Sequence, residues 1–191
     1  MTKILCVLGS PRKNGNSATI AKHFLNKAES LGAETKSYVL NDLSFRGCQS
    51  CLACKKELDR CTLKDDLTEV LEEGRTADVI VIATPVYGGY VPGQLKCFMD
   101  RTYSYLGPDY IMNPQPSRLP PGKKSVLIVT HGNPVESMYA DLYRRYTETF
   151  KRSWRAEENY LIIGCGLAPT ATPPEKLLKR AEELAQSIVA S

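Results

Sequence analysis

Four of the seven cysteines in this 191-residue chain lie within the short segment 47–61. They are Cys48, Cys51, Cys54 and Cys61, and their spacing is C-x2-C-x2-C-x6-C. Thiolates this close together can bind a metal ion or an inorganic cluster, form disulfides, or carry out thiol–disulfide exchange. In bacterial ferredoxins, three cysteines at two-residue intervals bind corners of an iron–sulfur cubane. Here Cys61 could bind the fourth corner.

Two other uses of these cysteines remain open. Structural zinc sites usually combine two C-x2-C pairs across a longer loop, so three closely spaced cysteines in a row fit zinc poorly. Redox chemistry at a C-x-x-C pair is the other alternative. The remaining cysteines, Cys6, Cys97 and Cys165, stand alone on an expected strand, an expected helix and a glycine turn. We expect these three to be thiols of the hydrophobic core.

A loop rich in short polar residues, "GSPRKNGNS" (9–17), follows the first apolar run. Gly15 lets the backbone curl, and free N–H groups at the start of the next helix can bind a phosphate. Arg12 can add a charge-assisted hydrogen bond. The side chains that could contact the phosphate are Ser10, Asn14, Asn16 and Ser17. The loop is neither a Walker A motif nor a G-x-G-x-x-G pattern, and an ordinary turn with an Asn-Ser helix cap is the alternative.

A second loop, "TPVYGGYVPG" (84–93), follows the third apolar run. Its proline and glycines predict a bent, exposed backbone, and Tyr87 and Tyr90 supply flat aromatic surfaces. A planar heterocycle could stack there and accept hydrogen bonds from the main chain. The alternative is a solvent-facing turn whose tyrosines cover the edge of the sheet.

These loops must be positioned by regular elements, and five apolar runs predict five strands, at 3–8, 34–40, 78–83, 125–130 and 160–163. Helical patterns lie between and after them, at 20–31, 66–75, 94–105, 136–154 and from Thr172, where Thr172 to Glu175 has capping-box spacing. Such alternation predicts an α/β fold with helices on both faces of a parallel sheet. We expect a flavodoxin-like, doubly wound sheet in the order 2-1-3-4-5. The chain would form one domain, 1–191, with insertions at 47–61 and 106–124.

The two loops, continued through "TPVYGGYVPGQLKCFMDR", and the cysteine run together resemble the iron–sulfur flavoproteins. These are a branch of the flavodoxin-like NAD(P)H-dependent FMN reductase superfamily, and the resemblance covers roughly residues 3–105. It implies FMN and a [4Fe–4S] cluster as cofactors, with the four cysteines as cluster ligands. The implied phosphate contacts are Ser10, Arg12, Asn16 and Ser17, and Asn14 remains a candidate from the residue types of the loop. The implied ring contacts are Pro85, Val86, Tyr87, Gly88 and Gly89, with Thr130, His131 and Gly132 from a third loop, "THGNP".

The function expected from both cofactors is electron transfer. FMN exchanges electrons in pairs or singly and the cluster exchanges them singly, so the protein could couple a reduced donor, such as NAD(P)H or a protein, to a small oxidant or a carrier protein. A flavin or quinone reductase whose cysteines hold zinc or nothing is one alternative, and a non-catalytic flavin-binding regulator is another. His131 could give a proton to the flavin or only bond a nearby carbonyl. The resemblance also implies a homodimer or homotetramer.

The net charge and the lengths of the apolar runs restrict the kinds of partner and the cellular location that we expect for the protein. A net charge of +4 is too small to indicate nucleic acid, and no apolar run approaches the roughly 20 residues that cross a membrane. Without a signal-peptide pattern, we expect a cytoplasmic protein with no membrane partner. The stretch 139–155 places aromatic residues on one helical face beside basic ones, which predicts packing on the sheet or a basic surface for an acidic carrier. We expect Asp100 and Arg101 to form a surface ion pair.

Overall fold

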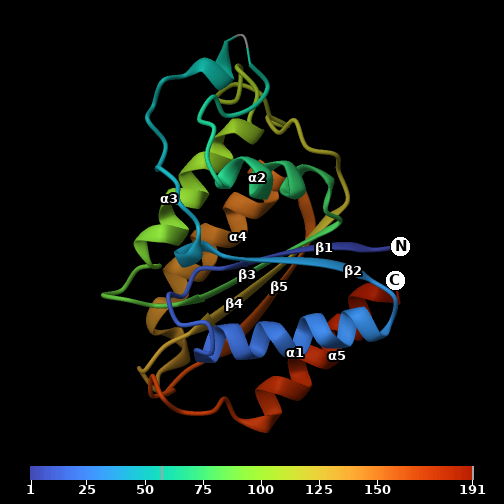
Figure 1. Cartoon of the computed structure of the whole chain (residues 1–191), viewed down its shortest axis with the longest axis vertical. Coiled ribbons are helices and arrows are strands. Elements are labelled where there is room, and N and C mark those ends of the chain that lie inside the picture. Colours follow the sequence, from blue (N-terminus) through green and yellow to red (C-terminus); the bar gives the residue numbers. More distant parts are fainter. Residues whose placement is uncertain (57, 191) are drawn as a thin grey trace.

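The computed structural model describes residues 1–56 and 58–190. Its centre is a five-stranded sheet in the order β2-β1-β3-β4-β5 (Figure 1). The strands are β1 (Lys3–Leu8), β2 (Glu34–Val39), β3 (Val79–Pro85), β4 (Lys123–Thr130) and β5 (Ala156–Gly164). All neighbouring strands pair in parallel. The predicted α/β class and the flavodoxin-like strand order are therefore confirmed.

The burial of each strand follows from its place in the sheet. Strands β1, β3 and β4 lie inside the sheet and are almost entirely buried, which explains their continuous apolar runs. The edge strands β2 and β5 carry charged and polar residues that reach solvent. In the sheet register, Leu5 lies beside Lys36 of β2 on one side and Ile80 of β3 on the other.

Helices cover both faces of the sheet (Figure 1). The α-helices are α1 (Asn16–Ser30), α2 (Leu67–Thr76), α3 (Gly93–Arg101), α4 (Ala140–Trp154) and α5 (Glu175–Val189). Helices α1 and α5 lie on one face, where they bury Phe24 and Ala185. Helices α2, α3 and α4 cover the other face, where Phe98 and Trp154 are buried. In the part of the chain that the structure describes, no helix is both long and apolar enough to span a lipid bilayer.

Several helix boundaries differ from the prediction: α1 begins at Asn16 instead of residue 20, and α4 begins at Ala140, after a 3₁₀ turn at Glu136–Tyr139. Helix α5 begins at Glu175 with Pro174 as its N-cap residue, so the capping box expected at Thr172 is wrong. A residue before a proline avoids the helical region, and Thr172 and Pro173 both precede prolines, which delays the helix. The helix expected at 94–105 ends at Arg101 and continues as the 3₁₀ turn η3 (Thr102–Tyr105).

The turn η3 packs tightly against α2. The buried Tyr105 hydroxyl donates a hydrogen bond to the carbonyl oxygen of Leu71, 2.8 Å away. A Cβ atom at Gly74 would collide with that hydroxyl, which explains a glycine inside α2. The contact fixes the chain just beyond α3, where the cysteine segment also lies.

The segments 47–61 and 106–124 lie side by side at the end of the molecule farthest from α5 (Figure 1). Segment 47–61 contains the 3₁₀ turn η2 (Ala53–Lys55), preceded by left-handed backbone at Ser50 and Leu52. Segment 106–124 is mostly irregular until it enters β4. Neither segment pairs with the sheet through backbone hydrogen bonds until β4 begins. Side-chain contacts between the two segments therefore help to position them.

Candidate functional site

Three loops converge at the carboxyl ends of β1, β3 and β4 and enclose a cavity of about 250 Å³, which we call the strand-edge cavity. It is lined by Ser10, Arg12, Gly15, Asn16, Ser17, Pro85, Val86, Tyr87, Thr130, His131, Gly132, Leu167 and Pro169. All predicted flavin contacts except Asn14, Gly88 and Gly89 are therefore brought together. The topology explains this convergence, because parallel strands point their carboxyl ends to the same edge.

The first loop leads directly into α1. The helix starts at Asn16, and its N-cap residue is Gly15, which has no side chain to occupy the N–H groups of the first turn. Ser10 and Ser17 are nearly fully buried beside these groups. The Ser10 hydroxyl accepts a hydrogen bond of 3.1 Å from the N–H of Arg12. This arrangement suits an anion, since uncapped N–H groups and the helix dipole both favour negative charge.

Asn14 lies outside the strand-edge cavity. Its side-chain oxygen accepts a hydrogen bond of 2.8 Å from the ammonium group of Lys22, on the exposed side of α1. The structure therefore gives Asn14 a different partner from the one expected.

A fourth loop, after β5, also lines the strand-edge cavity through Leu167 and Pro169. The sequence had not indicated these two residues as contacts. Arg12 Nη1 donates to the carbonyl oxygen of Pro169 at 3.3 Å, and Asn16 Nδ2 donates to that of Ala168 at 3.0 Å. These bonds tie the first loop to a segment more than 150 positions away. Two features of the sequence could have indicated this loop: the predicted fifth strand ends at the same edge of the sheet, and the glycine turn at 164–166 follows it.

In the second loop, Gly88 and Gly89 shape a turn instead of lining the cavity. Tyr87 and Tyr90 pair through two main-chain hydrogen bonds of 2.7 and 3.0 Å. The two glycines between them have positive φ angles of 55° and 87°. A two-residue hairpin of this kind requires left-handed backbone at both positions, which glycine adopts without strain. The turn leaves Tyr87 beside the cavity, and its side chain is half exposed.

The third loop is anchored by His131, which is 5% exposed. Its Nδ1 atom lies 2.9 Å from the carbonyl oxygen of Asn133, and its Nε2 atom lies 2.9 Å from the hydroxyl of Tyr143. A carbonyl oxygen only accepts, so Nδ1 carries the proton, and Nε2 lies beside the Tyr143 hydroxyl, which also donates to the carbonyl oxygen of Glu136 at 3.3 Å. Both ring nitrogens are thus engaged within the protein. Of the two predicted roles for His131, the carbonyl contact is the one that the structure shows.

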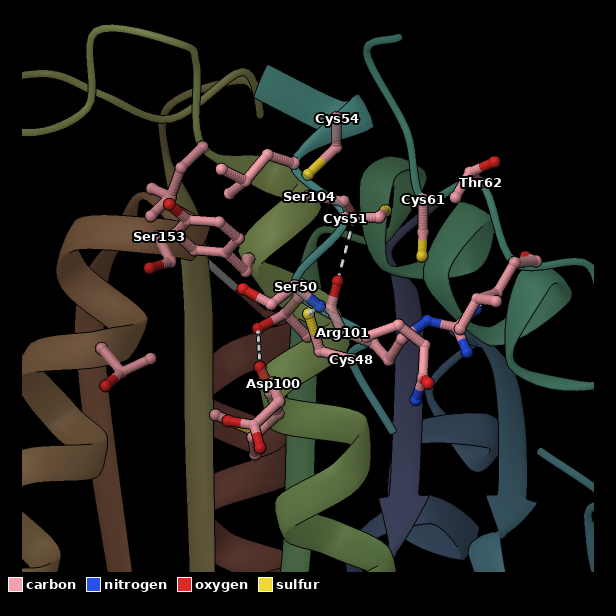
Figure 2. Close-up of a pocket in the computed structure, with 18 residues that line it drawn as sticks. Cys48, Ser50, Cys51, Cys54, Cys61, Thr62, Asp100, Arg101, Ser104 and Ser153 are labelled. Atoms are coloured by element: carbon pink, nitrogen blue, oxygen red, sulfur yellow. Dashed lines mark hydrogen bonds between the residues drawn. The ribbon is translucent and has the colours of Figure 1, made fainter. Parts of the chain in front are cut away.

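A second cavity, of about 470 Å³, is lined by Cys48, Cys51, Cys54 and Cys61, and we call it the cysteine cavity (Figure 2). Cys54 is buried, which raises the pKa of its thiol, and Cys48 and Cys51 are exposed. The N–H of Ser50 donates to the Cys48 sulfur at 3.5 Å. In the described residues, no group of three or more Cys, His, Asp or Glu side chains is placed to hold a single metal ion. The four thiols surround a space.

The isolated cysteines differ from one another. Cys6 is fully buried, and burial raises the pKa of its thiol to about 12. Cys97 and Cys165 are partly exposed. The prediction of core thiols is therefore confirmed only for Cys6.

The predicted surface ion pair between Asp100 and Arg101 is wrong. Asp100 bonds to Lys96 at 2.6 Å, one helical turn earlier. Arg101 is only 1% exposed and bonds to Asp65 at 2.8 Å. Adjacent residues on a helix point in different directions, so Asp100 and Arg101 do not face each other. Burial lowers the pKa of Arg101, but its contacts with Asp65 and Cys61 raise it more.

Two basic side chains join the segments 47–61 and 106–124. Lys55 donates to the carbonyl oxygens of Tyr103 and Leu106 at 2.5 and 2.6 Å, and it lies over the ring of Tyr103. In the opposite direction, Arg118 Nη1 donates to the carbonyl oxygen of Cys54 at 2.9 Å. The two predicted insertions are therefore bonded to each other beside the cysteine cavity.

Helix α3 connects the surroundings of the two cavities. It begins after the second loop, and its last residues, Met99 to Arg101, line the cysteine cavity. A groove of about 550 Å³ between α3 and α4 starts at Tyr90 and also includes Met99 and Asp100.

The predicted aromatic face of α4 packs on the sheet, where Phe150 and Trp154 are buried. The packing interpretation of that face is confirmed.

A model of the NADPH-dependent FMN reductase family matches residues 2–142 of the chain. An iron–sulfur flavoprotein of Methanocaldococcus jannaschii is 38% identical over 100 residues, which cover 52% of this chain and 51% of that protein. The chain spans about half the length of the curated relatives it matches first.

Solved structures share the fold over nearly the whole chain. NAD(P)H:quinone oxidoreductase from Methanothermobacter marburgensis has a TM-score of 0.74 at 18% identity, covering 98% of this chain and 96% of that one. FMN-dependent NADH-azoreductase from Bacillus anthracis, in complex with FMN, has a TM-score of 0.68 at 18% identity, covering 98% and 100%. These likenesses concern the fold, whereas the family model spans the first three loops of the strand-edge cavity. The chain belongs to the NADPH-dependent FMN reductase family.

Proposed function

We propose that the protein is an FMN-dependent oxidoreductase with two redox centres. FMN would bind in the strand-edge cavity, and a [4Fe–4S] cluster would bind in the cysteine cavity. The convergence of four loops on an uncapped helix N-terminus carries the flavin assignment. Family membership and relatives named iron–sulfur flavoproteins support the two assignments.

The residues of the strand-edge cavity fit the two parts of FMN. The N–H groups at the start of α1, with Ser10 and Ser17, suit its phosphate, and Arg12 adds a positive charge. The segment Pro85–Tyr87 and the third loop would hold the ring from two sides. When bound, FMN supplies the ability to accept electrons as a pair and release them singly. The chain contributes binding, orientation and a fixed third loop through His131.

The cysteine cavity fits a cluster by its donor set. A cubane is bound through four separate iron atoms, so its four thiolates surround the cluster instead of meeting at one ion. That Cys48, Cys51, Cys54 and Cys61 all line one cavity supports this proposal. The cluster would supply one-electron transfer. Together the two centres would connect a reduced donor, NAD(P)H or a protein, with a small oxidant or a carrier protein.

Purification under anaerobic conditions tests this proposal. FMN, iron, acid-labile sulfide and zinc are measured on the same sample. We expect one FMN with about four irons and four sulfides per chain, as the proposed cluster requires. Zinc without sulfide would support the reductase lacking a cluster, and protein that refuses added FMN would overturn the whole proposal.

Turnover is tested separately on the same material. Rapid bleaching of the flavin by NADPH or NADH, followed by reoxidation with a quinone, is the expected result. A flavin that stays oxidised with NAD(P)H and also with reduced carrier proteins would favour the non-catalytic regulator. The homodimer or homotetramer, and the cytoplasmic location, stay predictions.

A further inference from the structure

Arg101 is a buried cation with an unusual position at the end of α3. Its guanidinium forms a fork on the Asp65 carboxylate, with Nη1 at 2.8 Å and Nη2 at 3.2 Å. The same two nitrogens donate to the carbonyl oxygens of Arg46 and Leu63. These four contacts hold the guanidinium plane in one orientation, since a planar fork leaves little freedom once both ends are bound.

The third nitrogen of Arg101, Nε, is buried and has no hydrogen-bond partner among the described residues. Leaving a buried charged donor without a partner is costly, so such an atom calls for an explanation. Arg101 and Cys61 both line the cysteine cavity. Figure 2 shows Arg101 among Cys48, Cys51 and Cys61.

The charges around the cysteine cavity favour an anionic occupant. Lys55 and Arg118 add two further cations close by, and they donate to carbonyl oxygens of residues that line the cavity. Asp65 is held by Arg101, and Asp100, which also lines the cavity, is bound to Lys96. A group held by four thiolates is negatively charged, and it becomes more negative when it accepts an electron.

We propose that Arg101 is a positioning residue for the group bound by the four cysteines. Asp65 orients its guanidinium, and the arginine would present a fixed positive charge and its unpartnered Nε–H donor to that group. This inference rests on the proposed function, because it concerns the cluster assigned to the cysteine cavity. A fixed cation stabilises the reduced form more than the oxidised form, and hydrogen bonds to sulfur act in the same direction. Arg101 would therefore raise the reduction potential of the cluster and slow the release of the cluster's iron from the protein.

Three variants test the role of Arg101. Asp65→Asn keeps the cation and removes its counter-charge. The double variant Arg101→Met with Asp65→Asn removes the whole buried pair, which avoids leaving an unpaired carboxylate that could prevent folding. Arg180→Gln, on the exposed side of α5, loses one positive charge far from both cavities and serves as the control.

The midpoint potential of the cluster is measured by redox titration with electron paramagnetic resonance, and iron loss by release to a chelator. We expect Asp65→Asn to shift the potential to more positive values and the double variant to more negative values. The double variant should also release iron several-fold faster, and Arg180→Gln should match the wild type. Thermal unfolding and FMN content check that each variant is folded.

Two failures are distinguishable. If the wild type binds FMN but neither iron nor sulfide, the cluster assignment fails, and this inference fails with it. If the wild type holds the cluster and both Asp65 variants keep its potential and its rate of iron release, only the role of Arg101 is wrong.

Discussion

At the carboxyl edge of the sheet, the strand-edge cavity is formed by turns that leave β1, β3, β4 and β5. At the other end of α3, the cysteine cavity lies between the irregular segment that carries the four cysteines and the end of α3 with the turn η3, and residues of α4 complete its lining. The first cavity offers backbone N–H groups and small polar side chains, and the second offers thiols and the buried cation Arg101. The two sites thus differ in the elements that build them and in the chemistry they present.

This difference shows two ways of positioning a site. The turns at the strand-edge cavity leave strands that are held in place by the hydrogen bonds of the sheet. The cysteine cavity depends on side chains that cross between segments, such as Lys55, Arg101 and Arg118. If the sites are independent, a change in one should leave the other intact.

Loss of one thiol should have the largest effect. Cys54→Ser removes the most buried ligand of the proposed cluster, and we expect nearly all iron and sulfide to be lost while FMN content stays that of the wild type. Iron, sulfide and FMN analysis of anaerobic protein measures this. Cys165→Ser, outside the cysteine cavity, is the matched control. Loss of FMN together with iron would show that the two sites are not independent.

A valine in the second loop should disrupt the strand-edge cavity alone. Gly88→Val places a β-branched residue at a φ angle of 55°, which costs at least about 1–2 kcal/mol and distorts the turn beside Tyr87. FMN affinity should fall roughly tenfold or more, with unchanged iron, as measured by flavin fluorescence titration. At Gly93 a Cβ also meets open space, but the φ angle is not left-handed, so Gly93→Val is the control. Equal effects of the two valines would contradict the argument.

A smaller effect is expected from one charge at the strand-edge cavity. Arg12→Gln removes the proposed phosphate contact and should weaken FMN binding about three- to tenfold, equivalent to roughly 1 kcal/mol. The difference should shrink at high salt, because the side chain is exposed. Lys13→Gln removes the same charge from the next residue, which pairs with Asp42, and should bind FMN normally. If the two variants bind alike, Arg12 does not contact the phosphate.

Replacement of Lys123 should have the smallest effect on either site, because this residue stabilises the packing of β4 against α2 and contacts neither cavity. Its ammonium group is buried and donates to the carbonyl oxygen of Arg75 at 3.0 Å, near the end of α2. Burial lowers the pKa of Lys123 from 10.5 to about 8. Between these pH values the unfolded chain binds a proton that the folded chain lacks, so raising the pH favours folding.

The measurement is urea unfolding at several pH values between 8 and 10.5, for the wild type and Lys123→Met. The free energy of unfolding of the wild type, relative to the variant, should rise by up to about 1 kcal/mol per pH unit and be level below pH 8. FMN and iron content should be the same in both proteins. A difference that falls with rising pH would contradict the assigned direction.

The sequence by itself determined the sheet and the place of the loops that line the strand-edge cavity. Apolar runs such as that of β3 have to be buried on both faces, and their alternation with helices leaves few topologies other than the one observed. The order of strands then brings Ser10, Val86 and Thr130 to one edge. The cysteine spacing likewise singled out the second site, since all four thiols are close in the chain.

Only the tertiary structure decided which distant residues complete each site. Pro169 meets Arg12, and Asp65 meets Arg101, because packing brings together segments that are far apart along the chain. No local pattern marks such pairs. Neighbours such as Asp100 and Arg101 suggested a pairing that the geometry of the helix does not allow. Periodicity along the chain records which face of an element is buried, whereas the partner of a buried charge depends on how whole elements pack.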